Sequence, residues 1–111
     1  MHPKKVAKMK NYAYRRLPST LHKLRKQYNF TQKELADNLG ISVAMYSKIE
    51  LGKRMVKSEH LPKLARSLKS DVNDFYSLYL ADKIDSESQP YPKQVINKAF
   101  ELIQHHNNLL A

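Results

Sequence analysis

TQKELADNLGISVAMYSKIELGKR, residues 31–54, is the stretch of sequence that decides the fold. Thr31 can cap a helix, and Glu34, three residues later, completes a capping box that satisfies two orphan amide donors. Apolar residues then recur at helical spacing, at Leu35, Ala36 and Leu39. Gly40 follows where a left-handed C-cap is favoured, because glycine has no Cβ. The pattern predicts a short helix that ends in a tight turn.

The second half of the stretch predicts another short helix. Ser42 is its N-cap candidate and Gly52 ends it, with a buried side at Met45, Tyr46 and Ile49. Two short helices joined by a tight turn form the helix-turn-helix layout, whose second helix enters the DNA major groove. The order of these features therefore predicts a reader of duplex DNA.

Further residues with matching spacing lie on both sides of this stretch. They are Leu24 and Arg25 before it, and Leu61, Leu64, Ala65 and Leu68 after it. Within the stretch, the matching residues are Thr31-Gln32, Glu34-Leu35-Ala36, Leu39-Gly40-Ile41-Ser42, Ser47-Lys48-Ile49-Glu50 and Gly52-Lys53-Arg54. The whole set resembles the XRE family of helix-turn-helix domains, which includes phage repressors and Cro. The resemblance covers about residues 21–84 and implies an all-α bundle that binds double-stranded DNA without a cofactor. Residues 79–84, YLADKI, also resemble a subgroup often found beside DNA methyltransferase genes.

Composition narrows the class of protein. The chain has 111 residues and no cysteine, which predicts one small domain and excludes disulfides and thiolate metal sites. No apolar run approaches the ~20 residues of a membrane helix, and the basic N-terminus lacks the apolar core of a signal peptide. We therefore expect a cytoplasmic protein of bacterial or phage origin that associates with the nucleoid through DNA.

Charge is unevenly distributed along the chain. Residues 1–69 hold 17 Lys and Arg against 4 acids, a net charge of +13, whereas residues 70–111 hold 3 Lys against 6 acids, a net charge of −3. A basic half of this strength usually contacts phosphate, although Lys/Arg-rich segments also bind anionic membranes. The helix-turn-helix pattern favours nucleic acid and no membrane partner.

The chain divides into four predicted parts. Residues 1–18 form a basic N-terminal arm, 19–84 the DNA-binding domain, 85–91 a polar linker, and 92–111 a C-terminal helix. The arm could track phosphates or enter the minor groove, but a solvated tail, or a short helix that rests on the core, is slightly favoured.

A five-helix bundle is expected within the domain. Apart from the two short helices of residues 31–52, its helices are predicted at about Thr20–Tyr28, with Ser19 or Thr20 as the cap, at Glu59–Lys69 after Ser58, and at Val72–Lys83 after Asp71.

The appended helix, at about Pro92–Asn108, carries an apolar stripe that includes Ile96, Ala99, Phe100 and Ile103. A lone amphipathic helix must bury such a stripe. It can fold back on the domain or pair with another subunit, and we favour a homodimer, with a different protein partner as the alternative.

The resemblance implies which residues read bases. Four positions at the start of the second short helix match the family's base-reading positions: Val43, Ala44, Ser47 and Lys48. Lys48 could donate to guanine, Ser47 to either type of base, and Val43 or Ala44 could contact a thymine methyl group. Many relatives place glutamine or another long polar residue at the position of Val43, so direct readout is predicted to be limited and DNA shape to contribute.

Other residues are expected at the DNA backbone. By resemblance, Gln32 contacts a phosphate, helped by the dipole of the helix that begins there. Lys53 and Arg54 follow the glycine after the reading helix and are expected over the phosphates, and Lys26 and Lys33 are candidates from charge alone.

One pair of residues is assigned to structure. In relatives, an arginine and a glutamate at the positions of Arg25 and Glu50 form a partly buried ion pair between the first helix and the reading helix. Most relatives also have proline at the position of Val56, so the loop before the fourth helix is expected to differ here.

An enzyme is not predicted. The five histidines, at positions 2, 22, 60, 105 and 106, lack the three- or four-residue spacing of helical metal sites, and with only two glycines there is no phosphate loop. We predict a sequence-specific transcriptional regulator of repressor or controller type, with no catalytic residue, metal or cofactor. An antitoxin-like protein that binds a partner protein and its own promoter is the alternative. RNA binding is less favoured, because aromatic stacking motifs are absent.

Overall fold

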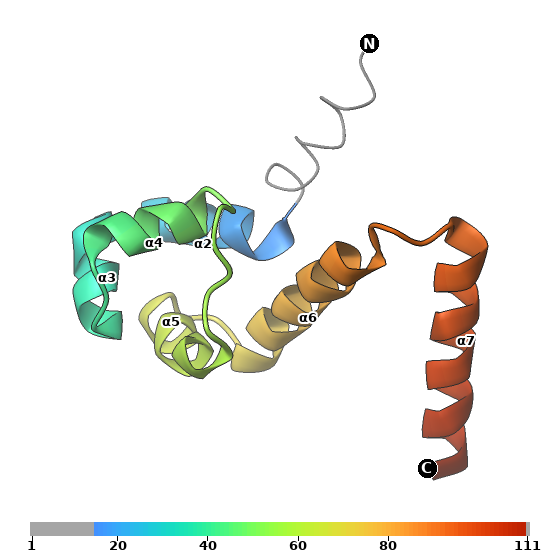
Figure 1. Cartoon of the computed structure of the whole chain (residues 1–111). Helices are drawn as coiled ribbons and strands as arrows, with labels where there is room; N and C mark the ends of the chain where they lie inside the picture. The colour runs from blue at the N-terminus through green and yellow to red at the C-terminus, as the bar shows by residue number, and fades with distance from the viewer. Residues whose placement is uncertain (1–14, 111) are drawn as a thin grey trace.

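The structure is a computed structural model that describes residues 15–110, and the side chains of residues 15–108. The described part is all α-helical, apart from one 3-10 turn, as the sequence predicts (Figure 1). Its helices, in chain order, are α2 (Arg16–Gln27), α3 (Gln32–Leu39), α4 (Val43–Glu50), the 3-10 turn η1 (Ser58–His60), α5 (Leu61–Ser67), α6 (Val72–Ser88) and α7 (Lys93–Leu110).

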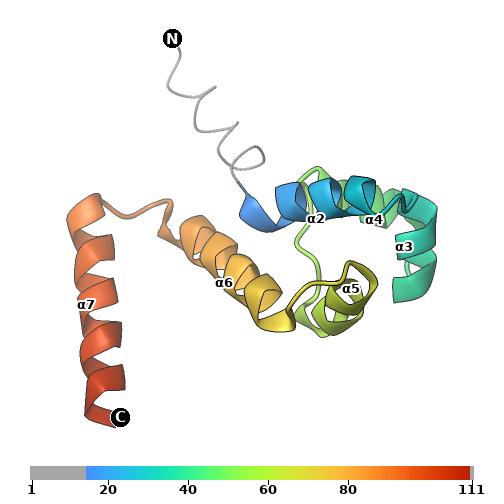
Figure 2. The same ribbon diagram turned by 180° about the vertical axis from the view of Figure 1, so that it is seen from behind.

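Helices α2 to α6 form the bundle. Helix α2 packs against α4 and α6, α3 packs against α4 and α5, and α5 packs against α6, so the bundle is closed around one core (Figures 1 and 2). The buried apolar residues are Leu17, Leu21, Leu35, Ala36, Leu39, Tyr46, Ile49, Val56, Leu61, Leu64, Ala65, Leu68 and Phe75. Every helix of the bundle contributes to this set, which fixes the position of α4 relative to the rest of the molecule.

Four helices end in the same way. A residue with a left-handed backbone conformation follows each helix, and its N–H group and that of the next residue donate hydrogen bonds to carbonyl groups near the helix end. After α4, Gly52 (φ 74°) donates to Ile49 O and Lys53 donates to Lys48 O, at 3.0 and 2.9 Å. This is a Schellman motif, and Gly40 (φ 71°) ends α3 with the same pattern. Both glycines were predicted as helix ends.

The other two left-handed ends are not at glycine. Asn29 (φ 59°) follows α2 and Lys69 (φ 52°) follows α5. Asparagine tolerates this conformation, whereas lysine adopts it at a cost of about 1–2 kcal/mol that the surrounding packing must offset. The ammonium of Lys69 lies 5.4 Å from the ring centre of Tyr28, a cation–π contact that ties these two ends together.

The prediction for the start of the first helix is wrong. Helix α2 begins at Arg16 rather than Thr20, and its N-cap, Arg15, makes no side-chain capping bond. The cap is supplied instead by α6, where Asp82 accepts hydrogen bonds from the backbone N–H of Arg16 at 2.8 Å and of Leu17 at 2.9 Å. A cap that lies more than sixty residues away cannot be read from local sequence.

This early start also shortens the predicted N-terminal arm. Residues 16–18 belong to α2, and Pro18 is tolerated there because the first turn of a helix needs no amide donor. The arm contacts considered for residues 1–14 lie outside the described residues.

Two further boundaries differ from the predictions. The fourth helix begins as the 3-10 turn η1, and the α-helix proper starts only at Leu61, with Pro62 in its first turn. The fifth helix, α6, continues to Ser88, so the linker predicted at 85–91 is reduced to residues 89–92. The polar residues before Pro90 can form the exposed end of a helix, so α6 continues through them and ends just before the proline.

The loop between α4 and η1 contains Val56, where relatives have proline. The Val56 side chain is buried in the core. The valine therefore fixes this loop by packing rather than by a restricted backbone.

Helix α7 stands apart from the bundle. Both views show it beyond the end of α6, joined to it by the short linker, with its axis turned away from that of α6 (Figures 1 and 2). None of its residues belongs to the buried core.

Candidate nucleic-acid interface

The two helices of the decisive stretch are held by the caps that their sequence predicts. The Thr31 hydroxyl accepts from Glu34 N at 3.0 Å, and the Glu34 carboxylate accepts from Thr31 N at 2.8 Å, so the capping box is complete. Ser42 Oγ accepts from Met45 N at 3.1 Å and caps α4. The two helices thus begin at fixed residues, and the turn between them is set by Gly40.

Helix α4 has one buried and one exposed side. Tyr46 and Ile49 are buried, and they anchor α4 against α2 and α3. The four base-reading candidates lie on the remaining surface: Val43, Ala44 and Lys48 are exposed and Ser47 is half-buried. With 46% of its surface exposed, Val43 is available for contact rather than used in packing.

The buried carboxylate of Glu50 joins three elements at the end of α4. Arg25 on α2 donates through Nε to Glu50 Oε2 at 2.6 Å and through Nη2 to Oε1 at 3.2 Å, a bidentate ion pair. Gln32, the first residue of α3, donates its amide to Oε1 at 3.2 Å, and His22 Nδ1 lies 3.0 Å from the same oxygen. The side chain of Glu50 is only 3% exposed, and that of Arg25 only 10%.

These contacts determine the protonation state of the cluster. Burial alone would raise the pKa of Glu50, but the hydrogen bonds from Arg25, His22 and Gln32, together with the nearby Tyr46 hydroxyl, hold it below its usual value. The hydrogen bond to Glu50 raises the pKa of Arg25. Burial raises the pKa of the neighbouring Tyr46 hydroxyl far above its usual range, with the charge of Glu50 adding to the effect. At neutral pH the cluster is an ionised carboxylate and guanidinium beside a neutral phenol.

The Tyr46 hydroxyl is the unsatisfied group of this cluster. It is buried, and no hydrogen-bond partner is found for it among the described residues.

The five phosphate candidates are placed differently. Gln32 is half-buried with its amide directed to Glu50, while Lys53 and Arg54 are exposed just after α4. Lys33 is exposed but paired with Asp37 on its own helix at 3.0 Å, and Lys26 is exposed at the end of α2. The structure therefore brings Gln32 to the C-terminal end of α4 by direct contact and leaves Lys53 and Arg54 exposed just beyond it.

Comparison with known proteins places this geometry in a family. A helix-turn-helix family model matches residues 21–75, which run from α2 into α6 and include both capped helices. Residues 21–75 are a helix-turn-helix domain of the XRE type. The chain is also 34% identical over 59 residues to the cryptic phage CTXphi transcriptional repressor RstR of Vibrio cholerae. That match covers 53% of each protein, so the chain spans about half the length of this relative.

Two features of the helix-turn-helix domain were not found from the sequence. The ion pair of Arg25 and Glu50 was expected, but His22 and Gln32 were not expected to bind the same carboxylate, and Gln32 had been assigned to phosphate alone. His22 lies three residues before Arg25, on the same face of α2, and this spacing was a usable signal. Asp82, the long-range cap of α2, gave no local signal.

The described part of the chain contains neither a metal-binding cluster nor a membrane-spanning helix. Among residues 15–108, no group of three or more His, Asp or Glu side chains is placed to hold a metal ion. No helix in the described part of the chain is long and apolar enough to cross a membrane.

Proposed function

We propose that this protein is a sequence-specific, double-stranded DNA-binding transcriptional regulator that acts as a homodimer, with α4 in the major groove. The observation that carries this proposal is the exposed face of α4, held by the buried cluster around Glu50 within a domain of the helix-turn-helix family. A similar repressor of phage origin supports the regulatory role. Cytoplasmic location follows from this proposal, and it includes no enzymatic step.

The chemistry of the exposed face suggests how bases are read. Val43 and Ala44 offer only methyl groups, which suit contact with thymine methyl groups, and Lys48 can donate to guanine O6 or N7. Ser47, half-buried, can donate or accept at short range. With one long polar side chain among four, base contacts are few, and we propose that DNA shape supplies the rest of the specificity.

The start of α3 is proposed to bind a phosphate. The bond from Gln32 to Glu50 fixes that side chain without using its second amide hydrogen, and the first backbone N–H groups of α3 point out of the helix end. Lys53 and Arg54 follow the same C-terminal end of α4 and would approach the backbone there, and Lys26 and Lys33 add charge. Phosphate contacts around this end of α4 would set its depth in the groove.

A selection from random duplex DNA at about 150 mM salt tests the proposal. An enriched inverted repeat, with half-sites about one helical turn (~34 Å) apart, is expected for a two-fold dimer. Recovery of DNA without any enriched sequence would overturn sequence-specific recognition. An antitoxin-like protein is the second candidate, because α7 exposes an apolar face that a partner protein could cover, and co-purification of a stoichiometric partner would support it.

Variants then test the role of α4. Lys48→Ala should lower specific affinity by roughly 5- to 150-fold and relax the preference at one base pair, since one good bidentate contact is worth about 1–3 kcal/mol. Lys98→Ala is the matched control, because it removes the same charge from the exposed face of α7. Equal losses in both variants would show that only total charge matters.

A further inference from the structure

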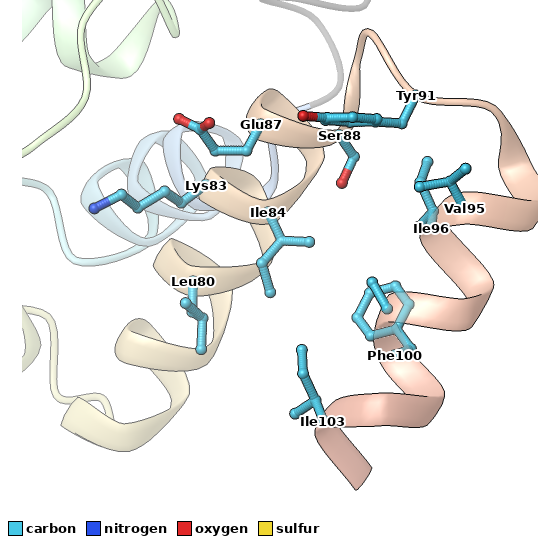
Figure 3. A pocket seen from close by; sticks show the side chains of 11 residues that line it. Leu80, Lys83, Ile84, Glu87, Ser88, Tyr91, Val95, Ile96, Phe100 and Ile103 are labelled. Carbon is cyan, nitrogen blue, oxygen red and sulfur yellow. The ribbon is translucent and has the colours of Figure 1, made fainter. Parts of the chain in front are cut away.

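Helices α6 and α7 enclose an apolar groove of about 520 Å³. Leu80 and Ile84 on α6 face Phe100 and Ile103 on α7 across it, and Tyr91 closes one end (Figure 3). The facing side chains do not close the gap between the two helices. The groove is therefore open, although its walls are of the kind that a folded protein normally buries.

The apolar surface of α7 is wider than one neighbouring helix can cover. Its apolar positions within residues 93–108 are Val95, Ile96, Ala99, Phe100, Leu102 and Ile103. At 100° per residue these positions span an arc of roughly 160°. Val95, Phe100, Leu102 and Ile103 remain 45–58% exposed. Helix α6 thus leaves about half of this face in contact with water, and a stable amphipathic helix requires a second apolar neighbour.

We propose that the groove receives α7 of a second copy of this chain, and that the exchange is reciprocal. Each α7 then lies between α6 and α7 of the other copy, so that four helices share one apolar core around a two-fold axis. This inference rests on the proposed dimeric regulator and specifies the surface that makes the dimer.

The low charge of α7 permits a second copy as the occupant. Residues 1–69 carry a net charge of +13, so two copies repel each other through their DNA-binding halves. Residues 92–111 contain only Lys93, Lys98 and Glu101, a net charge of +1, and two such helices approach with little repulsion. A strongly acidic partner would instead be drawn to the basic half.

The area is also sufficient for a dimer. Six apolar side chains of the groove and of α7 are 45–58% exposed: Leu80, Tyr91, Val95, Phe100, Leu102 and Ile103. Their complete coverage would remove at most on the order of 600 Å² of apolar surface per copy. A symmetric contact then buries about 1,200 Å² in total, the lower end of the range for specific interfaces. The contacting surfaces of the two copies are the same apolar patch, as an isologous interface requires.

Sedimentation of the full chain without DNA tests the proposal. The wild type and Gln94→Glu, which places a charge on the polar side of α7, should both be dimers at micromolar concentration. Ile103→Glu and Leu80→Glu should both sediment as monomers, because each places a charge within the shared core. Neither Ile103 nor Leu80 belongs to the core of the bundle, so helical content should be unchanged. A monomeric wild type at about 100 µM, or a dimer that survives both groove substitutions, would overturn the proposal.

Cross-linking tests the reciprocal arrangement directly. The chain has no cysteine, so Leu80→Cys and Ile103→Cys can be made as separate proteins and mixed with a short bis-maleimide. A cross-link between the two proteins is expected, because α6 of one copy then meets α7 of the other. Leu80→Cys mixed with Gln94→Cys is the control. Equal yields in the two mixtures would show that α7 does not enter the groove.

Failure of this inference is distinguishable from failure of DNA recognition. Ile103→Glu keeps α4 and the Glu50 cluster intact, so as a monomer it should still bind a single half-site. Half-site binding by a wild type that is itself monomeric would overturn the interface and leave the proposed reading of DNA in place.

Discussion

Replacing Glu50 with alanine should destabilise the protein more than any exposed acidic substitution. The Glu50 side chain is 3% exposed and accepts two hydrogen bonds from Arg25, which is itself buried. The substitution removes the carboxylate but leaves the guanidinium in place. Arg25 would then be a buried cation without a counter-charge, and an uncompensated buried charge destabilises the folded state.

The expected magnitude follows from what Arg25 retains. Breaking a buried pair on one side costs about 3–5 kcal/mol. Arg25 keeps one hydrogen bond, from Nη1 to Phe30 O at 2.9 Å, which favours the lower end, about 3 kcal/mol. For a domain of this size about 1 kcal/mol corresponds to a shift of roughly 4–8 °C, so the midpoint of thermal unfolding should fall by at least ~12 °C.

Circular dichroism at 222 nm, with heat and with urea, measures this change. Asp37→Ala is the matched control, because Asp37 is an exposed acid on the neighbouring helix, and its pair with Lys33 contributes at most about 0.5 kcal/mol. Glu50→Ala should also weaken DNA binding beyond the loss of stability, since Gln32 loses its anchor. If Glu50→Ala and Asp37→Ala unfold within about 2 °C of each other, the buried ion pair does not carry the stability argued for it.

Three further predictions concern the cap of α2, the effect of acid and the effect of salt. Asp82→Ala should lower the free energy of unfolding by about 2–3 kcal/mol in urea titrations, because two backbone donors at the start of α2 lose their acceptor; a loss below ~0.5 kcal/mol would contradict the capping role. Since the pKa of Glu50 is lowered by folding from its ordinary value of 4.5, its contribution to stability is present above that pH and lost as the pH falls through the lowered pKa. Urea titrations from pH 6 to 2 should therefore show a smaller acid-dependent loss for Glu50→Gln than for wild type, and parallel curves would disprove the assignment. Affinity for DNA should fall by about three decades or more between 50 and 200 mM salt if six or more phosphates are contacted, and fluorescence anisotropy with a flat salt response would refute the electrostatic proposal.

The local elements of the helix-turn-helix domain were predictable because their signals are short-range. The capping box at Thr31 and Glu34, the cap at Ser42 and the left-handed turns at Gly40 and Gly52 each depend on residues within four positions of one another. Each is a backbone requirement that few residue types satisfy, so the sequence alone identifies it.

Boundaries were predicted less well where the deciding group is distant or is of an untypical residue type. Helix α2 starts early because Asp82 reaches it from α6, and α6 runs past its expected end because polar residues at an exposed helix end resemble a linker. The left-handed turn at Lys69 gave no signal, since lysine is not selected for that conformation.

The sequence by itself determined the helix-turn-helix, the exposed face of α4 and the ion pair of Arg25 and Glu50 through family resemblance. Tertiary structure alone decided that His22 and Gln32 converge on the same carboxylate, since hydrogen bonds between helices depend on how those helices cross. It also decided that α7 projects from the bundle with about half of its apolar face uncovered. An amphipathic pattern states only that a helix has a face to bury, whereas the position of that helix against its neighbours determines whether the chain can bury the face alone.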